Sequence, residues 1–261
     1  MSAGRSPTAH LERDVSAEER KEIDAAMVSR ERFGNPITHK RTHIPVPWDS
    51  FRHLRPASAS PESTLSPWLD DQVIDFSLDL LGDRFQQAAF FSVAFYTALM
   101  DIDKGQTPAY NYERVRNWGT RATNPQHNVL TTKKAIVIPI IVNNNHWTLA
   151  VLDLKNSGIF YYDSLSLKRP KSALINPLRQ WLADEARTHS ITLSQDPKKW
   201  ALLSALSAQQ QGCDDCGVFV IFNAWNHALL LEMGAVRFSL KGAIGPLRYL
   251  LARNILAYRR A

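Results

Sequence analysis

Residues 135–163 read AIVIPIIVNNNHWTLAVLDLKNSGIFYYD and carry the strongest β-sheet signal in the chain. Residues 135–142 form a continuous run rich in β-branched side chains, which is typical of a buried strand. Residues 146–154 and 159–163 predict two more strands, joined by the turn-forming sequence Lys-Asn-Ser-Gly. Because proline has no backbone N–H, Pro139 predicts an edge or a bulge in the first strand.

Helical patterns lie before and after these strands. Apolar residues at helical spacing from Val73 predict a helix that ends at Gly82. The stretch 217–233 is apolar on all sides and is followed by Gly234, as in a buried core helix. Further helices are predicted over residues 90–100, 112–118, 176–187 and 247–258, with weaker strands near Thr192 and Leu202. The order of helices, strands and helices predicts an α+β domain with a central sheet.

The first 34 residues differ in composition from the rest of the chain. Ser16 and Glu19 fit a capping box, which predicts a charged helix after them. The apolar content of this segment is thin, so we expect the helix to be disordered or ordered only on a partner. A Pro/Ser-rich loop covers residues 56–67. We therefore divide the chain into an N-terminal charged segment, 1–34, and a domain, 35–261.

Composition excludes several classes of protein. Of the 261 residues 44% are apolar, enough for a core, and no run of 18 apolar residues predicts a membrane span. The N-terminus lacks the apolar segment of a secretion signal, so we expect a location in the nucleus or cytoplasm and no membrane partner. The net charge is +6, and residues 237–261 hold six basic residues and no acidic one. We expect these on the solvent face of the last helix, and no nucleic-acid-binding pattern accompanies them.

Two cysteines, Cys213 and Cys216, form neither a disulfide framework nor a complete four-cysteine zinc site, so we expect no metal and no cofactor. Cys216 stands where the buried helix begins, and a helix N-terminus stabilises a thiolate. His146 opens one strand and Asp163 ends the next, so the two can lie side by side. A cysteine nucleophile needs such a base and an acceptor that orients it. On these residues alone, an inert thiol and a structural histidine fit equally well.

Three motifs resemble those of the ubiquitin-like-protein-specific cysteine proteases, which include the SUMO deconjugases. The sequence NNNHWTLAVLDLKNSGIFYYDSLS is similar to the His-Trp…Asp-Ser block of the family, with the same 17-residue spacing from His146 to Asp163. The sequence QQQGCDDCGVFV is similar to its Gln…Asp-Cys-Gly block, and residues 68–71 are similar to its Trp-Leu-Asn-Asp. The resemblance implies a papain-like cysteine protease fold, a mixed sheet flanked by helices with the catalytic cysteine at the N-terminus of a buried helix.

The resemblance covers about residues 42–260 and implies a hydrolase, a thiol protease or isopeptidase that cleaves after the C-terminal Gly-Gly of a ubiquitin-like modifier. SUMO is the expected modifier, and SUMO or a related modifier with its conjugates is the expected partner of a monomeric enzyme. The implied residues are the nucleophile Cys216, the base His146, the orienting Asp163, the oxyanion donor Gln210, the Gly-Gly tunnel residues Trp68 and Trp147, and Asp71 opposite an arginine of the modifier.

Other readings stay open at this point. The same chemistry could act on a Nedd/Rub-type modifier, a related cysteine-dependent acyltransferase could share the triad, or the chain could be a catalytically dead binding module. The family has Asn-Gly-x-Asp-Cys where this chain has Gly212 to Cys216 without the asparagine. We expect Asp214 to point into solvent, since a carboxylate turned inward would oppose the thiolate. Cys213 could also form a reversible disulfide with Cys216 on oxidation.

Overall fold

The fold is built on one mixed five-stranded sheet. A computed structural model of the chain describes residues 14–56, 66–102, 107–121, 127–166, 172–204, 207–234, 238–240 and 244–259. The strands lie in the order β3-β4-β5-β6-β7. Their bounds are β3 Ala88–Phe90, β4 Ala135–Val142, β5 His146–Asp153, β6 Gly158–Tyr162 and β7 Ala201–Ser204.

The three predicted strands form the antiparallel centre of this sheet, and β3 and β7 pair in parallel with its two edges. The strand that contains Leu202 is β7, whereas Thr192 lies outside any strand. Pro139 follows the rule for its position. β3 pairs with β4 only as far as Val137, so at Pro139 the strand β4 has β5 as its single partner. Because no strand pairs with the other edge of β4 there, the missing N–H of the proline costs no hydrogen bond between strands.

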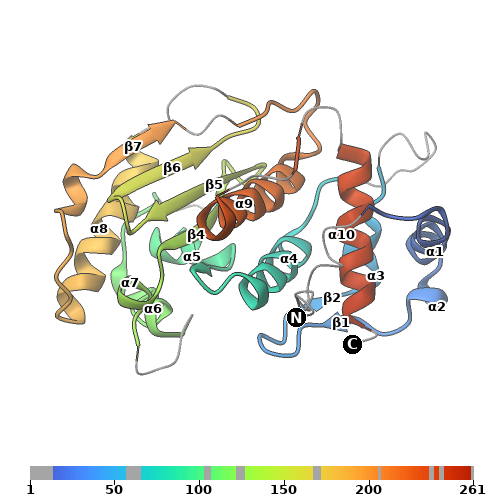
Figure 1. Cartoon of the computed structure of the whole chain (residues 1–261), viewed down its shortest axis with the longest axis horizontal. Coiled ribbons are helices and arrows are strands. Elements are labelled where there is room, and N and C mark those ends of the chain that lie inside the picture. Colours follow the sequence, from blue (N-terminus) through green and yellow to red (C-terminus); the bar gives the residue numbers. More distant parts are fainter. Residues whose placement is uncertain are drawn as a thin grey trace, which may run out of the picture.

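Helices cover both faces of the sheet, as Figure 1 shows. Alternate residues of β4 face opposite cores because the side-chain period of a strand is two. Val137 lies in one core with the helices α4, α9 and α10, and Ile138 in the other with α5 and α8. The described chain is therefore a three-layer α+β structure, in agreement with the sequence-based prediction.

The helices divide between these two cores. The first core includes residues of α1 Ala17–Val28, α2 Arg30–Phe33, α3 Trp48–Arg52, α4 Asp71–Arg84, α9 Cys216–Met233 and α10 Ile244–Tyr258. The second includes residues of α5 Ala94–Leu99, α6 Trp118–Arg121, α7 Val129–Thr132 and α8 Ser172–Thr188. Two short 3₁₀ turns, η3 Tyr112–Arg114 and η4 Pro197–Lys199, and a two-stranded ribbon of β1 Ile37–Thr38 and β2 Pro45–Val46 complete the elements.

Helix α9 is the central helix of the fold and packs on β5. Among the described residues it is the one helix with the length and apolar composition of a membrane span, but 72% of it is buried inside the protein. It is therefore a core helix. Gly234 ends it in a left-handed conformation with φ of 68°, as its position in the sequence predicts.

Several predicted boundaries are wrong. Helix α4 continues past Gly82 to Arg84, because Gly82 keeps helical geometry there and Phe85 forms the C-cap. Within the expected helix over 90–100, Phe90 is the last residue of strand β3 and the helix α5 covers only Ala94–Leu99. The expected helix over 112–118 is the 3₁₀ turn η3, with α6 beginning at Trp118.

The described part of the N-terminal segment packs on the domain. The capping box of Ser16 and Glu19 is formed, and Ile23, Met27 and Phe33 are buried in the first core. Helix α1 lies against α3 and α10 (Figure 1). These residues are therefore ordered by the domain itself rather than by a partner. Residues 1–13, and residues 57–65 of the Pro/Ser-rich loop, lie outside the described residues.

The expectation that the last helix turns its basic residues to solvent is wrong. Arg248 and Arg253 of α10 are only 1% and 6% exposed. Arg259, just after α10, donates to the carbonyl oxygen of Phe33. These arginines therefore hold the fold together and do not form a basic outer face.

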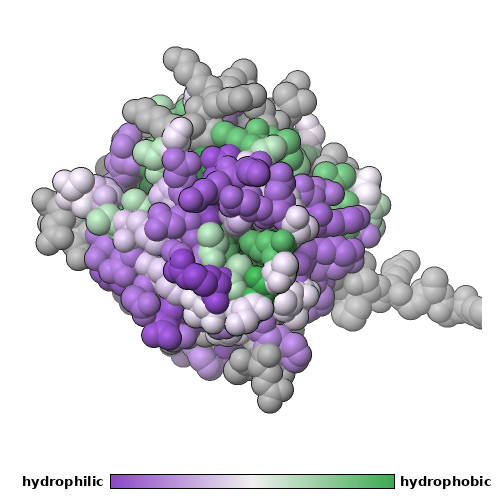
Figure 2. Space-filling view, turned by 90° about the vertical axis from the view of Figure 1, so that its left-hand side faces the viewer, coloured by the Kyte–Doolittle hydropathy of each residue, from purple (hydrophilic) through white to green (hydrophobic). Residues whose placement is uncertain are grey.

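Figure 2 shows the end of the molecule that lies on the left in Figure 1, which includes α8 and is far from α10. This end is a mostly polar surface with a small apolar hollow.

Candidate active site

The candidate site begins at the tight turn between β4 and β5. Asn143 and Asn144 of this turn have φ of 53° and 56°, in the left-handed region that asparagine tolerates better than most residues. The turn lets β5 start directly with His146, whose backbone is held by pairing with Val142. The sequence Asn-Asn-Asn thus fixes where the histidine stands.

His146 and Asp163 form a hydrogen-bonded pair at one end of the sheet. Nε2 of His146 lies 2.8 Å from Oδ1 of Asp163, and the two side chains are 14% and 15% exposed. The same carboxylate oxygen accepts the backbone N–H groups of Leu165 and Ser166, at 2.9 and 3.2 Å. Burial alone raises the pKa of Asp163, but the His146 bond and these N–H groups outweigh it and lower that pKa below its usual value. The carboxylate is therefore ionised and Nε2 carries the shared proton.

The imidazole is tuned by both of its neighbours. Burial lowers the pKa of His146, but hydrogen bonding and charge from Asp163 and Cys216 outweigh it and raise this pKa to about 9. The other ring nitrogen, Nδ1, is buried and has no hydrogen bond of ordinary geometry within the described residues. Cys216 thus raises the pKa of the ring without forming a hydrogen bond of ordinary geometry to Nδ1. Such loose contacts are common in substrate-free active sites.

Cys216 is the first residue of α9 and is 3% exposed. A side chain at Gly217 would place its Cβ 2.9 Å from Cβ of Leu69, so the glycine allows the segment around Leu69 to pack directly on the start of the helix. The structure therefore brings Cys216, His146 and Asp163 together, and their catalytic roles remain predictions.

Gln210 lies beside this group, in a fixed orientation. Its Oε1 accepts from the hydroxyl of Ser164 at 2.6 Å, and its backbone N–H donates to the Ser164 carbonyl at 2.9 Å. One N–H of its side-chain amide donates to the carbonyl oxygen of Gly212 at 2.5 Å. The second N–H of that amide is the one that could serve an oxyanion.

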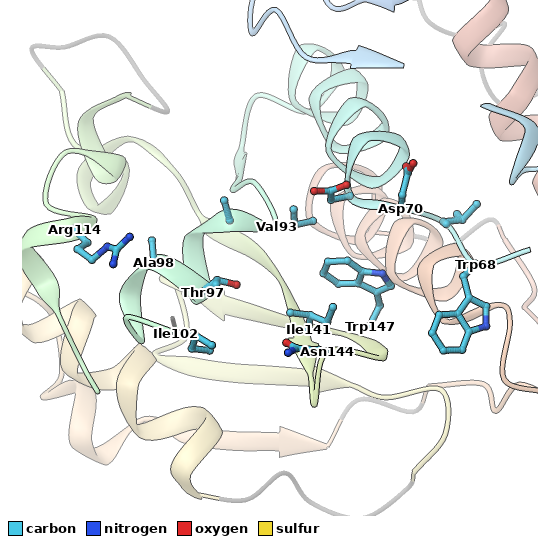
Figure 3. Close-up of a pocket in the computed structure, with 13 residues that line it drawn as sticks. Trp68, Asp70, Val93, Thr97, Ala98, Ile102, Arg114, Ile141, Asn144 and Trp147 are labelled. Carbon is cyan, nitrogen blue, oxygen red and sulfur yellow. The ribbon is translucent and has the colours of Figure 1, made fainter. Parts of the chain in front are cut away.

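A pocket of about 710 Å³ adjoins the site, and Figure 3 shows its lining. In that view Trp147 lies in the middle, between α5 and Trp68, while Arg114 marks the far end. Trp68 is 40% exposed, and Asp71, in the first turn of α4, also lines the pocket. The two tryptophans and Asp71 thus line one pocket, and their roles toward a substrate remain predictions.

The expectation that Asp214 points into solvent is wrong. Asp214 is half-buried, and its Oδ1 accepts the indole Nε1–H of Trp68 at 2.7 Å. Asp215 is bound instead by the buried guanidinium of Arg248, whose Nη2 lies 2.6 Å from its Oδ1. Both carboxylates next to the cysteine are therefore occupied by donors. The sequence gives only a weak signal that Asp214 belongs to the site, namely an acidic residue where the family motif has any residue. It gives no such signal for Arg248, which lies 33 residues beyond Asp215.

No cluster of three or more histidine, cysteine, aspartate or glutamate side chains that could hold a metal ion occurs within the described ranges of the chain. The expectation of no metal and no cofactor stays a prediction.

The chain is similar in sequence to known proteins. Residues 67–232 match the Ulp1 protease family, C-terminal catalytic domain. Ubiquitin-like-specific protease 1A of Arabidopsis thaliana is 31% identical over 194 residues, which cover 71% of this chain and 35% of that protein. Ubiquitin-like-specific protease 1 of Saccharomyces cerevisiae is 27% identical over 205 residues, 77% of this chain and 28% of that protein. The chain thus spans about a third of the length of these relatives.

Solved structures give the same picture at the level of the fold. The yeast Ulp1 protease domain in complex with Smt3, the yeast ortholog of SUMO, superposes with a TM-score of 0.71 at 26% identity, covering 94% of this chain and 96% of that one. SUMO protease Ulp1 with its catalytic cysteine oxidized to a sulfenic acid also gives a TM-score of 0.71 at 26% identity, covering 95% and 97%. With a family match over well more than half of its residues, the chain belongs to the Ulp1 protease family.

Proposed function

We propose that the chain is a cysteine protease that cleaves the peptide or isopeptide bond after the C-terminal Gly-Gly of SUMO. The observation that carries this proposal is Cys216 at the start of α9, next to an imidazole that Asp163 orients and whose pKa is raised to about 9. The names of the family relatives and the neighbouring complex with Smt3 support SUMO as the modifier.

Acylation follows from this arrangement. With its raised pKa, His146 is protonated at neutral pH and pairs with the Cys216 thiolate. The sulfur attacks the carbonyl carbon of the terminal glycine, and the carbonyl π electrons move to oxygen. The backbone N–H of Cys216 and the second amide N–H of Gln210 stabilise that oxyanion. As the C–N bond breaks, His146 gives its proton to the leaving amine, and a thioester remains.

Deacylation returns the site to its starting state. Neutral His146 takes a proton from a water molecule, whose oxygen attacks the thioester carbonyl. The C–S bond breaks, the modifier leaves as a C-terminal carboxylic acid that loses its proton to solvent, and the thiolate again faces a protonated imidazole. Asp163 holds the ring in one orientation through both steps and stays ionised.

The pocket between Trp68 and Trp147 supports selection of a glycine tail. In this proposal the flat indole faces of these two lining residues cover the modifier tail and leave room for its backbone but not for bulky side chains, so a Gly-Gly end enters and most other ends are excluded. Asp71 lines the same pocket, and in this proposal its carboxylate pairs with an arginine of the modifier.

The test is a panel of ubiquitin-like proteins that carry a propargylamide at the C-terminal glycine, incubated with the wild-type chain, Cys216→Ala and Cys213→Ala. Cys213 is the matched control, because it is the other free cysteine and is exposed rather than buried. We expect a covalent adduct with SUMO for the wild type and Cys213→Ala, and none for Cys216→Ala.

Other outcomes identify the other readings. An adduct with a Nedd/Rub-type protein in place of SUMO would change the modifier but keep the chemistry. Transfer of an acyl group from acyl-CoA to Cys216 without any modifier adduct would indicate the acyltransferase. Binding of a modifier without an adduct, by folded protein in reducing buffer, would indicate a binding module and overturn the proposal.

A further inference from the structure

The indole of Trp68 is tied to the loop that carries Cys216. Its Nε1–H donates to Oδ1 of Asp214 at 2.7 Å, and Asp214 stands two residues before the cysteine. Trp68 is 40% exposed, so surrounding side chains do not hold this ring in the way that they hold a buried tryptophan. Its hydrogen bond to Asp214 therefore has a large share in setting where the indole lies.

The backbone beneath the two residues is joined by a single guanidinium. Arg248 comes from α10 and is 1% exposed. Its Nη2 donates to the carbonyl oxygens of Pro67, at 2.9 Å, and Asp214, at 3.0 Å, and to Oδ1 of Asp215, at 2.6 Å. Pro67 is the residue before Trp68, and Asp215 is the residue before Cys216. One buried charge thus fixes both segments.

The same guanidinium also binds the backbone at the end of the preceding helix, α3. Nη1 of Arg248 donates to the carbonyl oxygen of His53, just after α3, at 2.8 Å, and Nε donates to Oδ1 of Asp215 at 2.9 Å. The planar fork of an arginine suits such a set of divergent acceptors, which a lysine could not reach together. The positive charge also offsets the Asp215 carboxylate beside the nucleophile.

A packing contact also joins the segment of Trp68 to the segment of Cys216. Leu69 lies against Gly217, so closely that a Cβ on the glycine would come within 2.9 Å of Cβ of Leu69. Trp68 and Cys216 are therefore connected three times: through the Asp214 side chain, through Arg248, and through the contact of the residues that follow each of them.

We propose that Asp214 and Arg248 are positioning residues that hold the Trp68 wall of the pocket at a fixed place relative to Cys216. The inference rests on the proposed function, because it assigns these residues to binding of the modifier tail at that site. Asp214 acts on the ring directly, and Arg248 acts on the two backbone segments. Neither residue touches the reacting atoms.

The test compares Asp214→Ala, which removes the acceptor, with Asp214→Asn, which keeps Oδ1 as an acceptor and removes the charge. Asp49→Ala, at an exposed aspartate in the first turn of α3, is the matched control. All variants are made with the second cysteine replaced, Cys213→Ala, so that alkylation reports Cys216 alone.

Three readouts are taken for each variant. The position of the Trp68 ring is followed by fluorine NMR of protein labelled with 5-fluorotryptophan, with the Trp68 signal identified by its loss in Trp68→Phe. The nucleophile is followed by its rate of alkylation with iodoacetamide, a reagent too small to need the pocket. Cleavage is followed with SUMO that carries aminomethylcoumarin on its terminal glycine.

For Asp214→Ala we expect a shifted and broadened Trp68 signal and a KM raised about tenfold, which is the loss of one hydrogen bond expressed as an affinity ratio. Alkylation of Cys216 should stay close to the wild-type rate. Asp214→Asn should restore the NMR signal and most of the KM, and Asp49→Ala should change nothing. A shift with no rescue by asparagine would contradict a role for the hydrogen bond.

An unchanged Trp68 signal in Asp214→Ala overturns the inference whether or not the protein cleaves SUMO. Absence of cleavage by the wild type, together with the expected NMR shift, overturns the proposed function instead and leaves the structural tie in place. The two failures are thus distinguished by a measurement that needs no substrate.

Discussion

Nε2 of His146 donates to Oδ1 of Asp163 across 2.8 Å, so the other ring nitrogen, Nδ1, is left for Cys216. This division fixes the tautomer, because an ionised carboxylate can only accept. It also makes the carboxylate the main support of a protonated ring, with a pKa raised to about 9.

The first prediction concerns activity against pH. If the active form contains protonated His146, kcat/KM should stay high through neutral pH and fall as the pH rises through about 9. Asp163→Asn removes the negative charge that favours the imidazolium, so this alkaline fall should move toward 6.5, the ordinary value for histidine. At pH 8 the variant should lose about tenfold or more in kcat/KM. An unmoved alkaline limb in Asp163→Asn would exclude His146 as its source.

The same pKa has a consequence for stability. The folded-state pKa of His146 lies above its unfolded value, so its contribution is complete below pH 6.5 and is lost as the pH rises toward about 9. Asp163→Asn should therefore destabilise the protein more at pH 6 than at pH 10. Urea unfolding of wild type and variant at these two pH values checks the direction.

The second prediction uses two glycines in equivalent positions. Gly217 is the second residue of α9 and Gly245 the second of α10, but a Cβ would meet Leu69 at the first and open space at the second. Alanine in a helix is ordinarily the better residue by about 1 kcal/mol. We expect Gly245→Ala to be neutral or stabilising and Gly217→Ala to cost about 1–3 kcal/mol from overpacking. Chemical denaturation of both variants decides, and equal effects would remove the argument for close packing.

The third prediction concerns Asp75, which accepts from the Ser92 hydroxyl and the Val93 N–H where the chain enters α5 and the pocket wall. Burial raises the pKa of Asp75 to about 6, against these hydrogen bonds. Because that pKa is raised, ionisation costs stability as the pH rises from about 4 to 6 and above. Asparagine can keep both contacts without the charge.

We therefore expect Asp75→Asn to raise the free energy of unfolding by about 1–2 kcal/mol at pH 7.5 and to change it little at pH 4. Asp49→Asn, at the exposed aspartate of α3, is the control and should be neutral at both pH values. Destabilisation of Asp75→Asn at pH 7.5 would show that the hydrogen bonds accepted by the carboxylate stabilise the fold by more than the burial of its charge costs.

The fourth prediction addresses Gln210. If its free amide N–H meets the oxyanion, Gln210→Ala should lower kcat by about 10²- to 10³-fold with little change in KM. Ser164→Ala removes the hydroxyl that orients the amide and should give a smaller loss of the same kind. A rise in KM with unchanged kcat for Gln210→Ala would assign the glutamine to substrate binding.

The sequence predicted those parts of the fold that depend on local periodicity. The run at residues 135–142 gave β4, and the apolar stretch with Gly234 gave α9 to within one residue. The prediction that the helix ends at Gly82 was wrong because a glycine can also continue a helix when its neighbours pack well. The N-terminal helix was expected to lack order because its apolar residues are few, but Ile23 and Met27 are buried in the first core, where α1 contacts α3 and α10, and α10 is remote in sequence.

The candidate site divided in the same way. His146, Asp163 and Cys216 stand at the ends of elements, and the resemblance of their motifs to those of a known family is what predicted that they come together. Asp214 and Arg248 could not be placed, because their partners lie 146 and 33 residues away along the chain. Basic residues on an amphipathic helix usually face water, and only the tertiary structure shows that Arg248 faces inward to a carboxylate.

The fifth prediction follows from that buried pair. Arg248→Gln leaves Asp215 without its charged partner and three backbone carbonyl groups without a donor, so we expect a loss of about 3–5 kcal/mol in unfolding free energy. Adding Asp215→Asn removes the unpaired carboxylate and should recover part of the loss, though not the carbonyl bonds. Arg253→Gln, at an equally buried arginine of α10 that binds Asn254, should destabilise without this rescue. Recovery of Arg253→Gln by Asp215→Asn to the same extent, measured by urea unfolding, would mean that the rescue is general and that Arg248 and Asp215 are not specifically coupled.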